Sequence, residues 1–152
     1  MVKTTVADLC RSAKAKKLGI KNEPDSDLHR ERLEWMCERA DEVLALVRRS
    51  WPNAKVSSGY RNRAVNRAVG GSNTSDHPKA LAIDIVAPGV VDYVPMAKYV
   101  ATYLGELGIR PQQILAESTP PHLHLGYPDE SERIAGYVTV LLRETSKGWA
   151  KP

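Results

Sequence analysis

Three of the four histidines lie in or beside two short β-rich segments that also contain one aspartate. Residues 81–87, Leu-Ala-Ile-Asp-Ile-Val-Ala, include Asp84, and in the second segment His122 and His124 alternate with leucines. Successive side chains of a strand point to opposite faces, so Asp84 lies opposite its flanking isoleucines, and the two histidines share a face. A carboxylate in so apolar a segment is costly to bury without a cationic partner.

A metal ion is one such partner. Two imidazole nitrogens and one carboxylate oxygen form a catalytic zinc site when a fourth position stays open to water. His77, which lies seven residues before Asp84 across a short turn, completes this donor set together with His124. The alternative is an ion pair between Asp84 and a lysine or arginine. From these residues alone both interpretations stay open.

Helices and strands that could position these side chains follow from the apolar spacing and the turn signals. The expected helices cover residues 5–18, a long stretch from a capping turn at 22–27 to before Pro52, then 61–69 and 93–107. The expected strands cover residues 54–58, 81–87, 112–117 and 122–127, and residues 136–143 are read as β-rich or helical. Helices first and short strands later predict an α+β fold. We expect a small antiparallel sheet carrying the site, packed by N-terminal and crossover helices, in one domain over residues 1–152.

The composition is that of an ordinary globular protein. The 152 residues are 42% hydrophobic and 26% charged, which argues against a mainly disordered chain. Lysine and arginine number 22 against 18 acidic residues, a mild excess that fits either a solvated surface or attraction to an anionic polymer. We expect a monomer without a membrane span, and reduced, buried Cys10 and Cys37. No helix-turn-helix, zinc-finger spacing or aromatic cluster indicates a nucleic-acid partner.

Two motifs resemble the zinc D-Ala-D-Ala carboxypeptidase family, which includes L-Ala-D-Glu endopeptidases and phage endolysins. The first motif, residues 57–72, begins Ser-Ser-Gly-Tyr-Arg-Asn-Arg. The second, residues 75–85, reads Ser-Asp-His-Pro-Lys-Ala-Leu-Ala-Ile-Asp-Ile and fits the family pattern Ser-x-His, four residues, Ala-x-Asp. The His-x-His of residues 122–124 belongs to the wider group, which shares its fold with the hedgehog signalling domain. The resemblance covers roughly residues 5–127.

The resemblance assigns roles to five side chains. It implies that His77, Asp84 and His124 bind zinc. It implies that Arg61 recognises a carboxylate of the substrate, for which a planar two-pronged guanidinium is well suited. It also implies that Ser75 either hydrogen-bonds the substrate or braces the site.

The general base is where this sequence departs from the family. Some members place an acid three residues before the last histidine ligand, where this chain has Pro121, and others place a glutamate six residues before it. Glu117 stands seven residues before His124, so the resemblance implies Glu117 as the base, across a loop one residue longer. His122 would then stabilise the oxyanion, shuttle a proton or brace the base. A further departure is Ala80, where the family usually has glycine.

The implied function is zinc-dependent hydrolysis of a peptide bond in the peptidoglycan stem peptide, by a carboxypeptidase or an endopeptidase. The alternative is a catalytically silent, zinc-containing module that binds the cell wall or builds a virion, which Pro121 and the displaced Glu117 leave open. The sequence shows no apolar signal-peptide core. We therefore expect synthesis in the cytoplasm and action on the wall after release or within a virion, as for a phage lysin.

Overall fold

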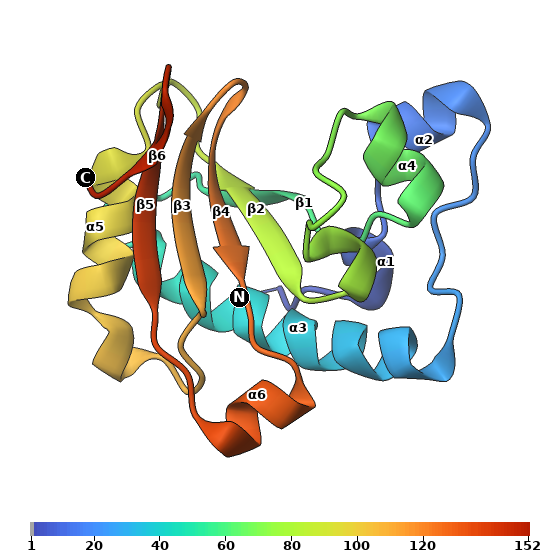
Figure 1. Ribbon diagram of the computed structural model, residues 1–152, viewed down its shortest axis with the longest axis horizontal. Helices are drawn as coiled ribbons and strands as arrows, with labels where there is room; N and C mark the ends of the chain where they lie inside the picture. Colours follow the sequence, from blue (N-terminus) through green and yellow to red (C-terminus); the bar gives the residue numbers. More distant parts are fainter. Residues whose placement is uncertain (1) are drawn as a thin grey trace.

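The computed structural model describes residues 2–152 and contains one six-stranded sheet with helices around it (Figure 1). The strands are β1 (Lys55–Ser58), β2 (Ala82–Val86), β3 (Gln113–Ser118), β4 (Pro121–Gly126), β5 (Val140–Thr145) and β6 (Gly148–Ala150). They follow the order β1-β2-β4-β3-β5-β6, and neighbours are antiparallel except for the parallel pair β3 and β5. This confirms the expected α+β fold with a mostly antiparallel sheet.

Six α-helices accompany the sheet in the described residues. They are α1 (Val6–Leu9), α2 (Ala13–Leu18), α3 (Asp27–Val47), α4 (Arg63–Ala68), α5 (Val94–Thr102) and α6 (Glu130–Ala135), with 3₁₀ turns η1 (His77–Lys79) and η2 (Leu104–Glu106). The long helix α3 begins where the sequence predicts it, because the Ser26 hydroxyl accepts a hydrogen bond from the His29 N–H at 3.1 Å. Such an N-cap satisfies a donor that the first helical turn leaves free.

The prediction of one helix over residues 5–18 is wrong. Thr5 caps α1 with a capping box, and Ser12 caps α2 by accepting from the Ala15 N–H. Because two capping residues compete with a continuous helix, the chain breaks between them. The predicted end at Gly19 is confirmed, since this glycine has the left-handed backbone conformation (φ 67°).

Two other helices are shorter than predicted. The helix predicted over residues 61–69 begins only at Arg63, because the Asn62 side chain caps it by accepting from the Val65 N–H at 2.9 Å. Arg61 therefore belongs to an extended segment rather than to the helix. The helix predicted over residues 93–107 ends at Thr102 and continues as η2, which contains Gly105, a poor helix former.

The last part of the chain is richer in structure than predicted. The stretch predicted as β-rich or helical, residues 136–143, contains the first part of strand β5 (Val140–Thr145). The prediction named neither α6 nor β6. The capping box between Asp129 and Glu132 at the start of α6 is a local signal that could have revealed that helix. Nothing local predicts β6, a three-residue strand whose pairing with β5 defines it.

The sheet has two chemically different faces. Its apolar face carries five side chains that are completely buried beneath α3 and α5, namely Ile83, Ile85, Ile114, Leu123 and Leu125. Each such burial stabilises the fold by about 1.5–3 kcal/mol. The opposite face carries Asp84, His122 and His124. Burial of the apolar face therefore fixes the strand register, and this register in turn places Asp84, His122 and His124 together on the polar face.

Helices α1, α2 and α4 lie on the β1 side of the sheet, away from β5 and β6 (Figure 1). Figure 1 shows α5 beside β5 and α3 running behind the lower part of the sheet, whereas α1, α2 and α4 group at the opposite side. Among residues 2–152, no helix has both the length and the apolar character needed to cross a membrane.

Candidate active site

Three predicted ligands converge on the polar face of the sheet. Asp84 of β2 is paired with His124 of β4, and the His124 Nδ1 lies 3.0 Å from the Asp84 Oδ1. The His77 Nε2 lies 3.1 Å from the same oxygen. All three residues are buried, with exposed fractions of 1% for His77, 5% for Asp84 and 7% for His124. We call this group the His77–Asp84–His124 cluster, and its donor atoms are close enough together to hold one metal ion.

The hydrogen bonding of His77 tests whether a cation fits this cluster. Its Nδ1 lies 2.5 Å from the carbonyl oxygen of Gly59, which can only accept, so Nδ1 carries the hydrogen. Burial lowers the pKa of His77 and favours the neutral ring. The Nε2 of the neutral ring then directs a lone pair at a carboxylate oxygen. A positive ion between these two atoms, a proton or a metal ion, removes their repulsion, and two imidazoles with one carboxylate suit zinc.

The charge state of Asp84 fits the same interpretation. Burial alone would raise the pKa of this carboxyl group, but positive charge on the His77 side of the carboxylate and hydrogen bonding to His77 and His124 outweigh burial and hold the pKa far below its usual range. Asp84 is therefore an ionised carboxylate inside the protein, the form that binds a metal ion.

The chain segment after β1 holds His77 in place. The Gly59 carbonyl accepts from the ring, and the Arg61 N–H donates to the His77 carbonyl at 3.4 Å. The Ser75 hydroxyl accepts from the His77 N–H at 3.2 Å, so in this structure Ser75 braces the site. Gly59 has no room for a side chain, because a Cβ atom there would lie 2.6 Å from the carbonyl oxygen of Leu9.

Ala80 lies in the left-handed region with φ 59°, the one described non-glycine residue with positive φ. This conformation explains why glycine suits the position, since a Cβ atom makes it less favourable by roughly 1–2 kcal/mol. The turn still forms, with the Ala80 N–H donating to the His77 carbonyl at 3.2 Å. The departure from glycine therefore leaves the path from His77 to β2 intact.

Glu117 and His122 form a second group, the Glu117–His122 pair. The two residues are directly opposite in the β3–β4 register, and the Glu117 Oε2 lies 2.5 Å from the His122 Nε2. The loop between Glu117 and His122 is one residue longer than the family pattern expects. This extra residue does not displace Glu117, because β3 continues through Ser118 and keeps Glu117 opposite His122. The Nε2 of His122 is also 3.6 Å from the Asp84 Oδ1, which places the pair beside the cluster.

His122 is protonated at neutral pH. Burial would lower its pKa, but the hydrogen bond to Glu117 and the charges of Asp84 and Glu117 raise the pKa to about 9. Its Nδ1 donates to the carbonyl of Pro120 at 2.7 Å, and its Nε2 faces Glu117. Both ring nitrogens are thus donors, as an imidazolium requires.

A cleft of about 840 Å³ lies over the site. All seven predicted site residues line it, namely Arg61, Ser75, His77, Asp84, Glu117, His122 and His124. Among these, Arg61 is half-buried, and burial lowers the pKa of its guanidinium. Its Nε is buried without a hydrogen-bond partner. In residues 2–152, no side-chain hydrogen bond or ion pair engages this guanidinium, so it is free to bind an anion that enters the cleft.

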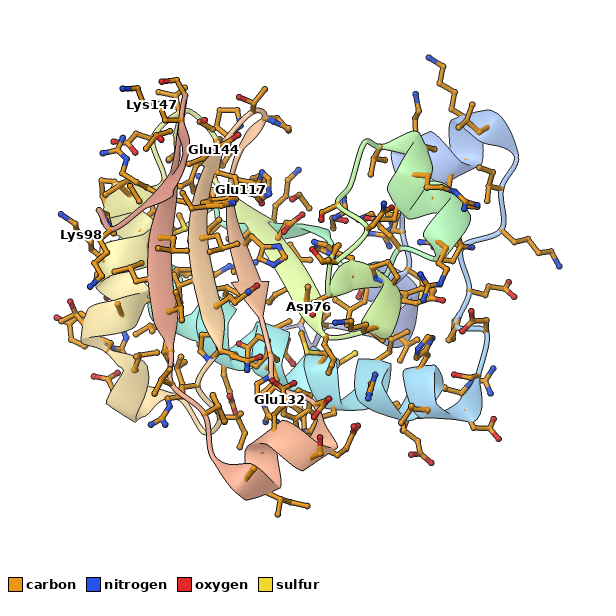
Figure 2. The ribbon with its side chains drawn as sticks, in the orientation of Figure 1. Asp76, Lys98, Glu117, Glu132, Glu144 and Lys147 are labelled. Carbon is orange, nitrogen blue, oxygen red and sulfur yellow. The ribbon has the colours of Figure 1, made fainter. Side chains whose placement is uncertain are left out.

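The cleft wall also contains residues that were not predicted, among them Asp76, Gln113, Leu115, Glu144 and Trp149. Strand alternation could have placed Gln113 and Leu115 on the face of Glu117. Glu144 gives no such signal, since it reaches the site through the pairing of β5 with β3 (Figure 2). The Asp76 side chain leaves no room for a side chain at position 126, because a Cβ atom at Gly126 would lie 2.8 Å from the Asp76 Oδ2.

Comparison with known families decides what this arrangement is. A family model described as Peptidase M15 matches residues 2–113. The chain belongs to the peptidase M15 family. It is a zinc metallopeptidase, which confirms the resemblance carried by the two sequence motifs. The matched segment of this M15 peptidase includes Arg61, His77 and Asp84, whereas β4 lies beyond it. No curated protein sequence matches the chain.

The cysteines take no part in the site. Cys10 and Cys37 are free thiols, as predicted, but both are only half-buried. Burial raises the pKa of each thiol, that of Cys37 to about 11. Both are therefore protonated at neutral pH.

Proposed function

We propose that this M15 peptidase hydrolyses a peptide bond of the peptidoglycan stem peptide, with His77, Asp84 and His124 as its zinc ligands. Family membership supports zinc peptidase activity on peptidoglycan in general. The observation that carries the proposal is the shared cleft, in which a possible base and a free guanidinium face the His77–Asp84–His124 cluster. A module that only binds the wall would not require an acid–base pair beside its metal site.

Glu117 and His122 both have a place in amide hydrolysis. Zinc, when bound, supplies a Lewis acid that polarises the scissile carbonyl and makes a water molecule more acidic. Glu117 accepts the proton of the attacking water through Oε1, because His122 engages Oε2, and then returns it to the leaving amine. His122 orients this carboxylate, and its positive charge favours the negative charge that develops on the carbonyl oxygen.

Arg61 positions the substrate by binding a carboxylate. A guanidinium that is half-buried and unpaired binds an anion more strongly than an exposed one, because less water screens the interaction. A D-Ala-D-Ala carboxypeptidase would use it on the terminal carboxylate. An L-Ala-D-Glu endopeptidase would use it on the free carboxylate of D-glutamate.

We further propose that the enzyme meets its substrate outside the cell in which it is made, after release at lysis or as part of a virion. The net charge of +4 supports this, since it favours approach to the anionic polymers of the bacterial wall. A phage lysin has this way of acting.

Digestion of purified peptidoglycan tests the function. We expect the zinc-loaded protein to release fragments and a chelator to stop the release. Mass spectrometry of the fragments then distinguishes loss of the terminal D-alanine from cleavage between L-alanine and D-glutamate. Binding to peptidoglycan without any release would contradict the proposal and identify the silent module instead.

A further inference from the structure

A carboxylate and an indole near the end of the chain lie on the same sheet face as the catalytic groups. Glu144 and Trp149 are cross-strand partners in β5 and β6, so their side chains share a face. The parallel pairing of Leu115 with Leu142 places Glu144 on the face of Glu117. Both Glu144 and Trp149 line the cleft. Figure 2 shows Glu117 and Glu144 close to each other at the upper end of the sheet.

Glu144 is fixed in place and charged. Its Oε2 accepts from the Ser118 N–H at 2.7 Å and from the Ser118 hydroxyl at 3.1 Å. The backbone hydrogen bond from Ser118 is the main cause that lowers the pKa of this carboxyl group, which is therefore ionised at neutral pH. In the described part of the chain no lysine or arginine forms an ion pair with Glu144, whose hydrogen bonds come from the Ser118 and Thr119 segment.

Trp149 adds an aromatic surface to this carboxylate. The residue is 47% exposed, although a large apolar side chain is normally buried. The face of an indole attracts cations, and tryptophan does so more strongly than tyrosine or phenylalanine. The two groups together favour an ammonium ion. An anion would be repelled by Glu117 and Glu144, and an apolar group would remove water from a carboxylate without replacing it.

Resting on the function proposed above, we propose that Glu144 and Trp149 bind the side-chain ammonium of the diamino acid in the stem peptide. Arg61 follows β1, so the cleft would hold an anionic group at one edge of the sheet and a cationic group at the other. These two residues lie beyond the segment that matches the family, 2–113. They would thus select the substrate, whereas the family segment supplies most of the metal site.

The dimensions of the sheet and the peptide agree. Two strand spacings separate the row of Glu117 from that of Trp149, which corresponds to about 10 Å. In the stem peptide a single D-alanine separates the diamino acid from the D-Ala-D-Ala bond. One extended residue spans about 3.5 Å, and the flexible side chain of the diamino acid covers the remainder. Because the diamino acid lies on the acyl side of that bond and the terminal carboxylate on the other side, the subsite suits the carboxypeptidase reaction.

Hydrolysis of two matched peptides tests this inference. The first is L-Ala-γ-D-Glu-L-Lys-D-Ala-D-Ala, and the second carries an acetyl group on the lysine amine, which removes its charge. We expect the wild-type, zinc-loaded enzyme to show a KM about tenfold lower for the free amine. Glu144→Gln can still accept from Ser118 but lacks the charge, so its preference should fall to within about twofold. Trp149→Ala should reduce the preference, and Trp149→Phe should restore part of it.

Glu31→Gln is the matched control, because it removes the same charge from an exposed position on α3. This control should keep the wild-type preference. Equal KM values for the two peptides in the wild type, or an unchanged preference in Glu144→Gln, would overturn the inference.

A binding measurement separates this inference from the proposed function. Calorimetric titration of both peptides into zinc-loaded Glu117→Gln does not depend on hydrolysis. Tighter binding of the free amine, lost when Glu144→Gln is added, supports the ammonium subsite even if the wild type cleaves neither peptide. Equal binding of both peptides would overturn the inference, whereas absent cleavage would contradict the proposed function alone.

Discussion

The His77–Asp84–His124 cluster and the Glu117–His122 pair share one sheet face but are held in different ways. In the cluster no side chain is more than 9% exposed, and the backbone of Gly59 fixes the His77 ring. In the pair the side chains are 27% and 14% exposed, and they hold each other by an ion pair across one hairpin. Metal ligands need rigid, desolvated positions, whereas a base must reach water and substrate. Rigidity and access are thus divided between two groups of side chains that share β4.

The largest loss of zinc binding is expected from a change at Asp84, whose Oδ1 both His77 and His124 contact. Asp84→Asn keeps the shape of the side chain but removes the charge that both imidazoles contact. We expect zinc affinity to fall by more than about 100-fold, beyond the 10- to 100-fold typical of outer-shell changes, and hydrolysis to be lost. Metal analysis after dialysis measures the first effect. Full zinc retention by this variant would show that the ligands are elsewhere.

A change in the pair should separate chemistry from metal binding. Glu117→Gln removes the proton acceptor but no ligand of the cluster. We expect kcat to fall by about 10²- to 10⁴-fold while zinc content stays at the wild-type level. Initial rates on a stem peptide, together with metal analysis of the same sample, measure both quantities. A variant with undiminished kcat would place the base elsewhere.

The backbone support of the cluster predicts a smaller effect. In Gly59→Ala the new Cβ would meet the Leu9 carbonyl oxygen at 2.6 Å, so the segment that accepts from the His77 ring must move. We expect zinc affinity to fall by about 10- to 100-fold, as for the loss of an outer-shell partner. Gly105→Ala is the control, because nothing lies within 4 Å of a Cβ at that glycine. Equal zinc affinities of the two variants would contradict the role of Gly59.

The smallest effect concerns Ser75. Ser75→Ala removes the hydroxyl that accepts from the His77 N–H, a loss of about 1 kcal/mol in the free energy of unfolding. If the hydroxyl only braces the site, zinc affinity falls a few-fold and KM stays constant. A raised KM with unchanged zinc affinity would instead assign Ser75 to substrate binding. Thermal unfolding, metal titration and initial rates distinguish the two roles.

Much of the candidate site could be predicted because its signals are local. Strand alternation places His122 and His124 on one face whatever the rest of the fold does. The six residues between His77 and Asp84 allow little besides a turn and the start of a strand. Helix boundaries were less well predicted, because capping by Ser12 and Asn62 divided or shortened two apolar stretches.

What the sequence by itself determined is therefore the set of donor groups, the strand faces that carry them and the family motifs. The tertiary structure alone decided which strands are neighbours. The pairing of β2 with β4 brings Asp84 to His124, forty residues away, and the pairing of β5 with β3 brings Glu144 beside Glu117. Such contacts depend on the burial of the apolar face as a whole, since no local spacing specifies which strand will cover which. The candidate metal ligands could be read along the chain, but the cleft around them is a product of the whole fold.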